Sequence, residues 1–246
     1  MNLALDIGNT RIKGGLFRGK QLLGHSDWAT QEWALIAAFA KEMQARQVVL
    51  SAVAPVDEEV VEQLKRQTDY WLEITHLTPM PFKVAYKTPH TLGRDRIAAV
   101  AGAHARFPGH NCLVVDCGTC IKYDMLTAEG VYLGGNIAPG AFMRLRAMHE
   151  FTARLPLAPM EMPADFIGDS TTTALQNGAL LGATLEIEGF VQTFRRRFAD
   201  LIVILTGGDA TFFRPVLPFD LLVEPQLTLH GLNHLLLFNT ATHNQP

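Results

Sequence analysis

The sequence is poor in cationic residues and has no long apolar segment. Its 21 Lys and Arg are outnumbered by 24 Asp and Glu, and the net charge of -3 excludes the basic surface typical of nucleic-acid binders. Apolar runs such as residues 201–205 and 235–238 fall far short of the roughly 20 residues that span a bilayer, and Asp6 stands where a signal peptide would be apolar. We therefore expect a cytoplasmic protein with small-molecule partners and no nucleic-acid or membrane contact.

Cysteine is also scarce. The three cysteines, Cys112, Cys117 and Cys120, lie close together in an apolar stretch, and an odd number there argues against a disulfide framework. The Cys-x-x-Cys spacing and the nearby His110 leave a zinc site open, but alternation along a strand would send neighbouring side chains to opposite faces. Buried, reduced thiols are the favoured interpretation.

Apolar residues make up 48% of the chain, which is enough to fill the cores of two ordinary domains. Apolar periodicity and turn residues predict an α/β fold, with one domain over residues 1–109 and a second over residues 110–246. The predicted strands cover residues 2–7, 12–18, 21–27, 48–53, 72–77, two strands from residue 111, and 131–138, 201–205 and 221–224. The predicted helices cover residues 31–47, 56–70, 95–107, from Pro139 toward 155, 171–199 and 231–239.

One pattern occurs twice. Residues 3–10 and 113–119 are both apolar runs that end in Asp-x-Gly, at Asp6 and at Asp116. Because glycine tolerates turn dihedrals and close approach, such a strand end can bring a carboxylate and bare backbone N–H groups to one point, which suits phosphate and metal. Two such ends predict two related halves that face a shared cleft for a nucleoside triphosphate.

Residues 6–13 suit a triphosphate with hydrated magnesium. Asp6 supplies a carboxylate, Asn9 and Thr10 are polar turn residues, and Lys13 supplies a positive charge. A hairpin turn with Asp6 as an acceptor is the ordinary interpretation of an isolated Asp-x-Gly-Asn. The repeat at Asp116 favours the phosphate site instead.

Two further segments carry candidate chemistry. Gly207 and Gly208 follow a predicted buried strand, and a turn without side chains there lets a nucleoside lie against the backbone, although Gly-Gly is also common in loops. In residues 93–96 a carboxylate, Asp95, is flanked by two arginines, so it should stay ionised and act on a substrate that the guanidinium groups bind. A solvated ion-pair cluster at a helix start is the alternative for this segment.

The ordered turns resemble the superfamily of actin-like proteins, sugar kinases and heat-shock ATPases, in which two related domains close over ATP. Further motifs resemble the type III pantothenate kinase family: Asp6 to Lys13 as Asp-Ile-Gly-Asn-Thr-x-x-Lys, Tyr86 followed by Gly93-Arg94-Asp95-Arg96, Asp116-Cys117-Gly118-Thr119, residues 134–140 and residues 168–171. The resemblance implies two ribonuclease-H-like domains of the actin-like ATPase type with a nucleotide cleft between them.

It also implies an activity, the transfer of the terminal phosphate of ATP to the 4'-hydroxyl of pantothenate at the start of coenzyme A biosynthesis, and a homodimer. Asp95 would be the catalytic base, and Asp116 would bind a monovalent cation, potassium or ammonium. The expected ATP-binding residues, with Asp6 reaching magnesium through water, are Asp6, Ile7, Gly8, Asn9, Thr10, Arg11, Ile12, Lys13, Thr119, Gly207 and Gly208. The expected pantothenate-binding residues are Tyr86, Gly93, Arg94, Asp95, Arg96 and Thr171.

The chain departs from the family pattern at one point, and other interpretations stay open. After the second Asp-x-Gly-Thr the family often has Ala-x-Thr, whereas this chain has Cys120-Ile121-Lys122, so Lys122 could weaken or replace the potassium requirement unless strand alternation turns it away. Asp169, Ser170 or Thr171 could each be a helix N-cap. We expect residues 171–199 to supply much of the dimer contact. Another small-molecule kinase, or a nucleotide-binding regulator without turnover, is the alternative function.

Overall fold

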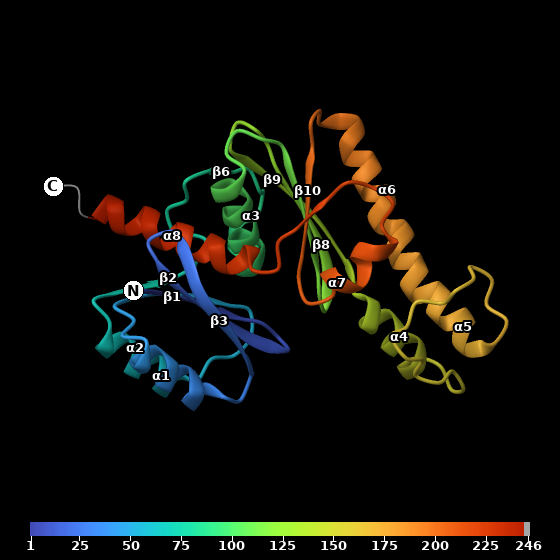
Figure 1. Ribbon diagram of the computed structural model, residues 1–246, viewed down its shortest axis with the longest axis horizontal. Coiled ribbons are helices and arrows are strands. Elements are labelled where there is room, and N and C mark those ends of the chain that lie inside the picture. The colour runs from blue at the N-terminus through green and yellow to red at the C-terminus, as the bar shows by residue number, and fades with distance from the viewer. Residues whose placement is uncertain (244–246) are drawn as a thin grey trace. The chain divides into compact units, whose positions relative to one another are not determined.

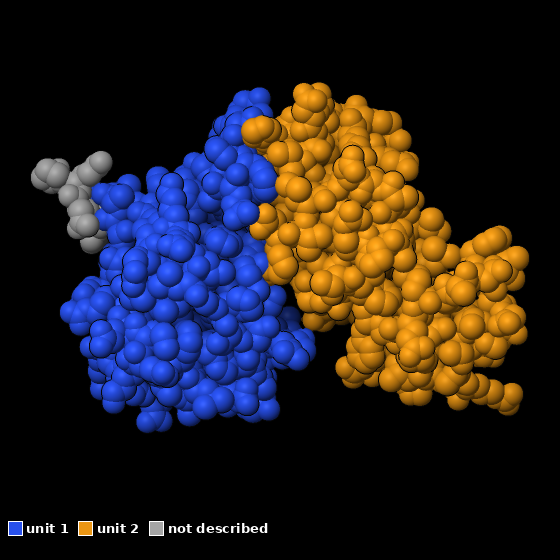
Figure 2. All heavy atoms as spheres, viewed as in Figure 1, with its two compact units in different colours: residues 1–109, 126–134, 226–246 blue, residues 110–125, 135–225 orange. Residues whose placement is uncertain are grey.

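The computed structural model describes residues 1–243 and divides into two compact units (Figure 2). Among the described residues, the first comprises residues 1–109, 126–134 and 226–243; the second comprises residues 110–125 and 135–225. The units are therefore not the two continuous halves 1–109 and 110–246. The difference arises because the last helix, α8 (Leu227–His243), packs against helix α3 (Arg94–Arg106) of the first unit. No helix within residues 1–243 is both long and apolar enough to cross a bilayer.

The first unit contains a five-stranded sheet of order β3-β2-β1-β4-β5 (Figure 1). Its first three strands form an antiparallel meander, whereas β4 and β5 run parallel to β1. The strands are β1 (Asn2–Ile7), β2 (Arg11–Arg18), β3 (Gln21–Ala29), β4 (Gln47–Ala52) and β5 (Tyr70–Glu73). The helices between the later strands are α1 (Trp33–Glu42) and α2 (Glu58–Gln67), and a 3-10 turn, Pro89–Thr91, precedes α3.

Strand alternation gives this sheet two buried faces. Leu3, Leu5 and Ile7 of β1 pack with side chains of α1 and α2, while α8 covers the opposite face and contacts β1 and β2. Helices α3 and α8 lie side by side (Figure 1), and a β-carbon at Gly102 or Gly231 would overlap the backbone of the other helix. These two glycines therefore permit the close helix contact that holds α8 in the first unit.

The second sheet has the order β11-β10-β7-β8-β9-β6. Its strands are β6 (Lys83–Val84), β7 (Cys112–Cys117), β8 (Cys120–Leu126), β9 (Val131–Pro139), β10 (Ile202–Thr206) and β11 (Leu222–Val223). Strands β7, β10 and β11 are parallel neighbours, so their carboxyl ends meet at one edge. Leu113, Val115 and Cys117 of β7 face a core shared with helices of the second unit.

The helices of the second unit are α4 (Ala141–Glu150), α5 (Thr171–Gln176), α6 (Gly182–Arg197) and the short α7 (Ala210–Phe213), followed by a 3-10 turn, Arg214–Val216. A π-helical turn, Asn177–Leu181, joins α5 to α6, so the predicted helix over residues 171–199 is one helical rod with a π-helical turn in it (Figure 1). The predicted start of a helix at Pro139 is wrong, because Pro139 ends β9 and Gly140 is the N-cap. A β-carbon at Gly140 would overlap the Gly118 carbonyl, so the turn there requires glycine.

Candidate active site

The turn between β1 and β2 places Asp6 and Lys13 side by side in the first unit. The Gly8 N–H donates to the Arg11 carbonyl at 3.0 Å, and the resulting register sets Asp6 opposite Lys13. Directly opposite residues of an antiparallel pair share one face of the sheet. Because Ile7 and Ile12 fill the core next to α1 and α2, the carboxylate and the ammonium group project from the other face. The predicted turn residues Asn9, Thr10 and Arg11 are exposed.

Asp95 lies in the first turn of α3, whose N-cap is Gly93. Its Oδ1 atom accepts the Arg96 backbone N–H at 2.9 Å. The first turn of a helix favours a negative charge, because the unpaired N–H groups there carry partial positive charge. The start of the helix therefore holds the Asp95 carboxylate at a fixed place.

The two arginines beside Asp95 have different partners. Arg94 donates to Glu73 Oε1 at 3.0 Å, so its guanidinium is engaged with a second carboxylate. Arg96 is almost fully buried, and its guanidinium carbon lies 5.6 Å from the centroid of the Tyr86 ring. Arg94 is therefore tied to β5, and Arg96 lies over an aromatic ring, while the flanking of the Asp95 carboxylate by these guanidinium groups stays a prediction.

Tyr86 lies against a glycine in the same unit. Gly134 has a φ of +95°, and a β-carbon there would lie 2.8 Å from the Tyr86 ring. The ring therefore rests on bare backbone at Gly134 and also contacts Arg96. Our sequence interpretation named the tyrosine but gave neither Gly134 nor Glu73 a role, and these contacts between distant parts of the chain leave no periodic signal.

The ends of β7 and β10 meet in the second unit, where Asp116 is in register with Thr206. Gly207 follows with a φ of +92°, and a β-carbon there would overlap the Cys117 carbonyl and the Asp116 carboxylate. Gly208, in contrast, meets no atom within 4 Å and is exposed. The two glycines thus have different roles, since Gly207 is required for packing and Gly208 leaves an open backbone surface. Helix α7, with four residues, adds little dipole field here.

Asp116 forms an ion pair with Lys122, the residue at which the chain departs from the family pattern. Lys122 Nζ lies 2.7 Å from Asp116 Oδ2, and the two side chains are only 16% and 15% exposed. Burial, together with the negative charge of Asp116, raises the pKa of the nearby Asp209 carboxyl. The ion pair shows that strand alternation turns Lys122 toward the Asp116 carboxylate and not away from it.

The two predicted cation sites, at Asp6 and at Asp116, differ in how well their residues fit a cation. No three His, Cys, Asp or Glu side chains within residues 1–243 form a metal-binding group, so a divalent ion there needs water and phosphate oxygens as well. Asp6, with Oδ1 buried beside the turn, fits magnesium of this kind, which is held by few carboxylates and by substrate phosphates. Asp116 does not fit a monovalent cation in the same way, because the Lys122 ammonium already lies against its carboxylate.

The remaining predicted residues lie in the second unit. Thr119 is exposed in the β7–β8 turn, and its carbonyl accepts the Gly140 N–H at 3.1 Å. Thr171 is exposed at the first position of α5, whereas Ser170 is the N-cap and forms a capping box with Thr173. The capping role therefore belongs to Ser170, and the Thr171 hydroxyl is not used for it.

The cysteine thiols are not part of this chemistry, although the Cys117 carbonyl lies in the turn beside Asp116. Cys112 and Cys117 are buried free thiols, and burial raises the pKa of Cys112 to about 12, which disfavours the thiolate that binds zinc.

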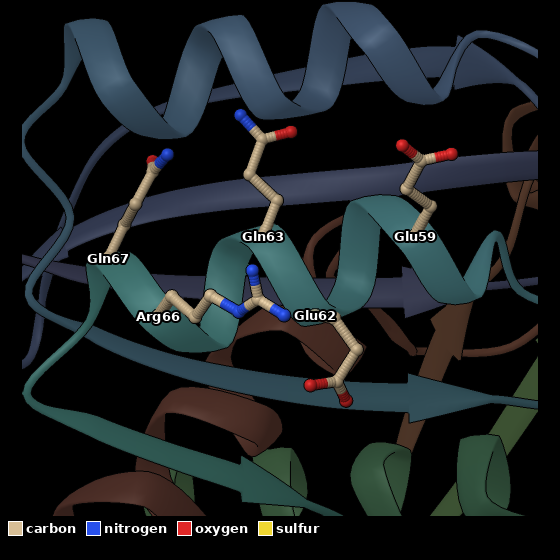
Figure 3. A pocket seen from close by; sticks show the side chains of 5 residues that line it. All are labelled: Glu59, Glu62, Gln63, Arg66 and Gln67. Carbon is tan, nitrogen blue, oxygen red and sulfur yellow. The ribbon is translucent and has the colours of Figure 1, made fainter.

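Figure 3 shows a polar hollow on α2 in which Gln63 and Gln67 point toward the neighbouring helix. The side chains that line it are Glu59, Glu62, Gln63, Arg66 and Gln67, and none of them is a predicted site residue.

The fold and the site define the class of protein. Two sheets that each carry an Asp-x-Gly turn are the architecture of actin-like ATPases and related kinases, and solved structures of similar fold agree. A putative Baf family transcriptional activator from Campylobacter jejuni aligns with a TM-score of 0.63 at 22% identity, covering 97% of this chain and 99% of that one. A putative N-acetylmannosamine kinase from Listeria monocytogenes aligns with a TM-score of 0.55 at 15% identity, covering 97% and 99%. At these identities the likeness shows the fold alone.

Sequence comparison identifies the family. The family model for type III pantothenate kinase matches residues 2–193. A type III pantothenate kinase from Christiangramia forsetii is 39% identical over 241 residues, covering 97% of this chain and 99% of the relative. One from Bacteroides fragilis is 38% identical over 241 residues, covering 98% and 99%. The chain belongs to the type III pantothenate kinase family, as the motifs indicated, although Gly207 and Gly208 lie outside the matched segment.

Proposed function

We propose that this protein transfers the terminal phosphate of ATP to the 4'-hydroxyl of pantothenate, forming 4'-phosphopantothenate in the cytoplasm. The observation that carries the proposal is the placement of Asp95 at the start of α3, next to Arg96 on the Tyr86 ring. A carboxylate base beside a buried guanidinium and an aromatic wall suits an acceptor that has both a hydroxyl and a carboxylate. Family membership supplies the kinase chemistry.

The β1–β2 turn is the proposed binding site for the triphosphate of ATP. Asp6 orients hydrated magnesium, which supplies charge neutralisation to the triphosphate when it is bound. Lys13, directly opposite Asp6 in the register, adds a positive charge on the same face. Gly8 shapes the turn through its N–H bond to the Arg11 carbonyl, and the exposed Asn9 and Thr10 offer hydrogen-bond donors to phosphate oxygens. Arg11 and Lys13 are the cations nearest this turn in sequence.

Asp95 is the proposed catalytic base. Phosphoryl transfer proceeds through a loose transition state, so the protein mainly positions the reactants and neutralises charge. Asp95 accepts the proton of the attacking hydroxyl, and the oxygen then bonds to the terminal phosphorus as the bond to the leaving ADP oxygen breaks. The Arg96 N–H that Asp95 Oδ1 accepts holds the carboxylate in place during this exchange.

The acceptor pocket is built from residues 93–96 and Tyr86. We assign the pantothenate carboxylate to Arg96, since a guanidinium recognises a carboxylate with two parallel hydrogen bonds. Arg94, which is held by Glu73, fixes the start of α3 and lines the pocket. Thr171, whose hydroxyl is exposed and not used as a cap, is a further proposed contact to pantothenate.

The sheet edge at which β7 and β10 end is the proposed binding site for the nucleoside of ATP. Gly208 presents open backbone on which a flat base or ribose can lie, and Gly207 shapes the turn that leads to it. Thr119, exposed in the neighbouring turn, offers a hydroxyl to ATP.

We also propose a homodimer that forms through the second unit. Large apolar side chains are exposed on and near α4 and α6 of this unit, and exposed apolar side chains that gather on one surface often mark protein–protein contacts. They are Phe142, Phe151, Phe166, Ile167 and Leu185. Leu185 lies on the helical rod over residues 171–197 and the other four lie on α4 and the segments before the rod, so we place the contact on the rod and on these neighbouring segments. We propose that a second copy of the chain packs against these apolar side chains, because a symmetric pair buries the same surface on both subunits.

An acceptor panel tests the assigned substrate. The protein would be incubated with magnesium, ATP and, in separate reactions, pantothenate, a hexose or acetate, and phosphorylated products would be followed by mass spectrometry. We expect product from pantothenate alone. Product from a hexose or acetate, with none from pantothenate, would assign the chain to a different small-molecule kinase activity.

A further inference from the structure

The ion pair between Asp116 and Lys122 is shielded and closely fitted. Asp116 is the penultimate residue of β7 and Lys122 lies on β8, and both side chains project from the face opposite the core that contains Ile121. The Nζ to Oδ2 distance of 2.7 Å is that of a charge-assisted hydrogen bond. Exposed pairs contribute little because water screens them, whereas this pair is at most 16% exposed. The ammonium group therefore stays at the carboxylate.

The backbone oxygens around Asp116 already accept hydrogen bonds within the chain. The Cys117 carbonyl accepts the Asp209 N–H at 2.9 Å, and the Thr119 carbonyl accepts the Gly140 N–H at 3.1 Å. Oδ1 of Asp116 packs against Gly207 so closely that no β-carbon fits. A hydrated cation that entered this place would have to displace the ammonium group and also compete for these oxygens.

The internal repeat gives Lys122 a counterpart. In the first turn the Gly8 N–H donates to the Arg11 carbonyl, and in the second the Gly118 N–H donates to the Cys120 carbonyl at 3.1 Å. Lys13 and Lys122 each follow the accepting residue by two positions. In both turns a lysine on the second strand thus lies beside the aspartate that is the penultimate residue of the first strand.

We infer that Lys122 is the monovalent cation of this protein: its ammonium group permanently supplies the positive charge at Asp116, so that ATP binding and turnover need neither potassium nor ammonium. The inference concerns the nucleotide-binding site of the proposed kinase and rests on the proposed kinase function. A charge on the chain occupies its place at every salt concentration, whereas the occupancy of a dissociable ion follows mass action. Lys122 acts here as a positioning residue that fixes Asp116 beside Gly207.

The first test needs only the unmodified protein. Binding of a non-hydrolysable ATP analogue would be measured by calorimetry, and turnover by product formation, in tetramethylammonium chloride and in potassium chloride at equal ionic strength. We expect the Kd of the analogue, kcat and the KM for ATP to agree within about twofold between the two salts. A tenfold or larger gain in affinity or rate with potassium would overturn the inference.

Substitutions of Lys122 sharpen the test. In Lys122→Ala the vacated volume can admit an ion, so we expect affinity for the analogue to fall about tenfold or more in tetramethylammonium and to recover in potassium or ammonium. In Lys122→Met the side chain still fills the place without a charge, so we expect the loss without recovery. Lys41→Met removes an exposed lysine on α1 and is the matched control. Equal affinity of Lys122→Ala and the unmodified protein in every salt would contradict the inference.

The two readouts separate this inference from the proposed function. Binding of the analogue requires no acceptor, so it reports on the cation even if pantothenate is not phosphorylated. Salt-independent binding without any phosphopantothenate would refute the kinase assignment and leave the role of Lys122 standing. Phosphopantothenate formation that depends on potassium would do the reverse.

Discussion

The guanidinium of Arg96 lies over the ring of Tyr86, with its central carbon 5.6 Å from the ring centroid. A cation above an aromatic face is attracted by the ring quadrupole, and more strongly where water is excluded. Because the ring also rests on Gly134, the pair forms a fixed wall in the first unit. Asp95, adjacent to Arg96 in the chain, starts the same helix, so the proposed base and the wall are placed by one element.

Tyr86→Leu tests that wall. The substitution keeps an apolar side chain but removes the aromatic face on which Arg96 stacks. We expect the KM for pantothenate to rise roughly 5- to 30-fold, which corresponds to about 1–2 kcal/mol of lost interaction. The KM for ATP should stay within about twofold and is the internal control. Equal rises in both KM values would show that the pair does not belong to the acceptor pocket.

The two glycines after β10 should respond differently to alanine. Gly207→Ala puts a β-carbon into the Cys117 carbonyl and forces a left-handed backbone on a non-glycine residue, so we expect the melting temperature to fall by several degrees and nucleotide affinity to drop about tenfold. Gly208→Ala meets no atom within 4 Å and should keep the melting temperature of the unmodified protein. Calorimetry and thermal melts measure both. A stable Gly207→Ala that binds nucleotide normally would contradict the proposed packing of this turn.

A histidine pair between α3 and α8 predicts how stability depends on pH. His104 Nδ1 lies 3.2 Å from His234 Nε2, and burial, His104 and Lys20 lower the pKa of His234 from 6.5 to about 4. Between these values the unfolded chain binds a proton that the folded one does not, so stability falls as the pH drops from 6.5 toward 4. His234→Gln should reduce this loss, making the fall in melting temperature smaller by about 2–4 °C. Thermal melts at several pH values decide, and parallel curves would contradict the linkage.

Leu185→Glu tests the proposed dimer. A carboxylate on the exposed face of α6 would be buried without a partner if a second copy packs there, so we expect dissociation to monomers in light scattering coupled to size exclusion. Leu77→Glu, on an exposed side chain of the first unit, is the matched control and should leave the assembly unchanged. A monomeric unmodified protein, or a dimeric Leu185→Glu, would refute this contact.

Local features of this fold could be predicted from the sequence. The β1–β2 turn follows from Gly8 after the apolar run of β1, and the register of this turn sets Asp6 and Lys13 on one face. The start of α3 near Asp95 follows from the apolar spacing after residues 93–96. These signals lie within a few residues of one another, where strand and helix periods determine which side chains meet.

Contacts between distant segments could not be predicted in this way. That Arg94 pairs with Glu73, and that Tyr86 rests on Gly134, depends on how strands and helices are arranged after folding. The assignment of α8 to the first unit depends on its close contact with α3 at Gly102 and Gly231. The direction of Lys122 depended on the length of one turn, because a shift of one residue would have sent its side chain to the core face.

Replacement of the proposed base tests the central claim most directly. The unmodified protein and Asp95→Asn would be compared with magnesium, ATP and pantothenate, with phosphopantothenate followed by mass spectrometry and ATP-analogue affinity by calorimetry. We predict product from the unmodified protein, a loss of kcat in Asp95→Asn of about 100-fold or more, and little change in nucleotide affinity. Nucleotide binding without product from the unmodified protein, or a fully active Asp95→Asn, would contradict the account, and the former would indicate a nucleotide-binding regulator.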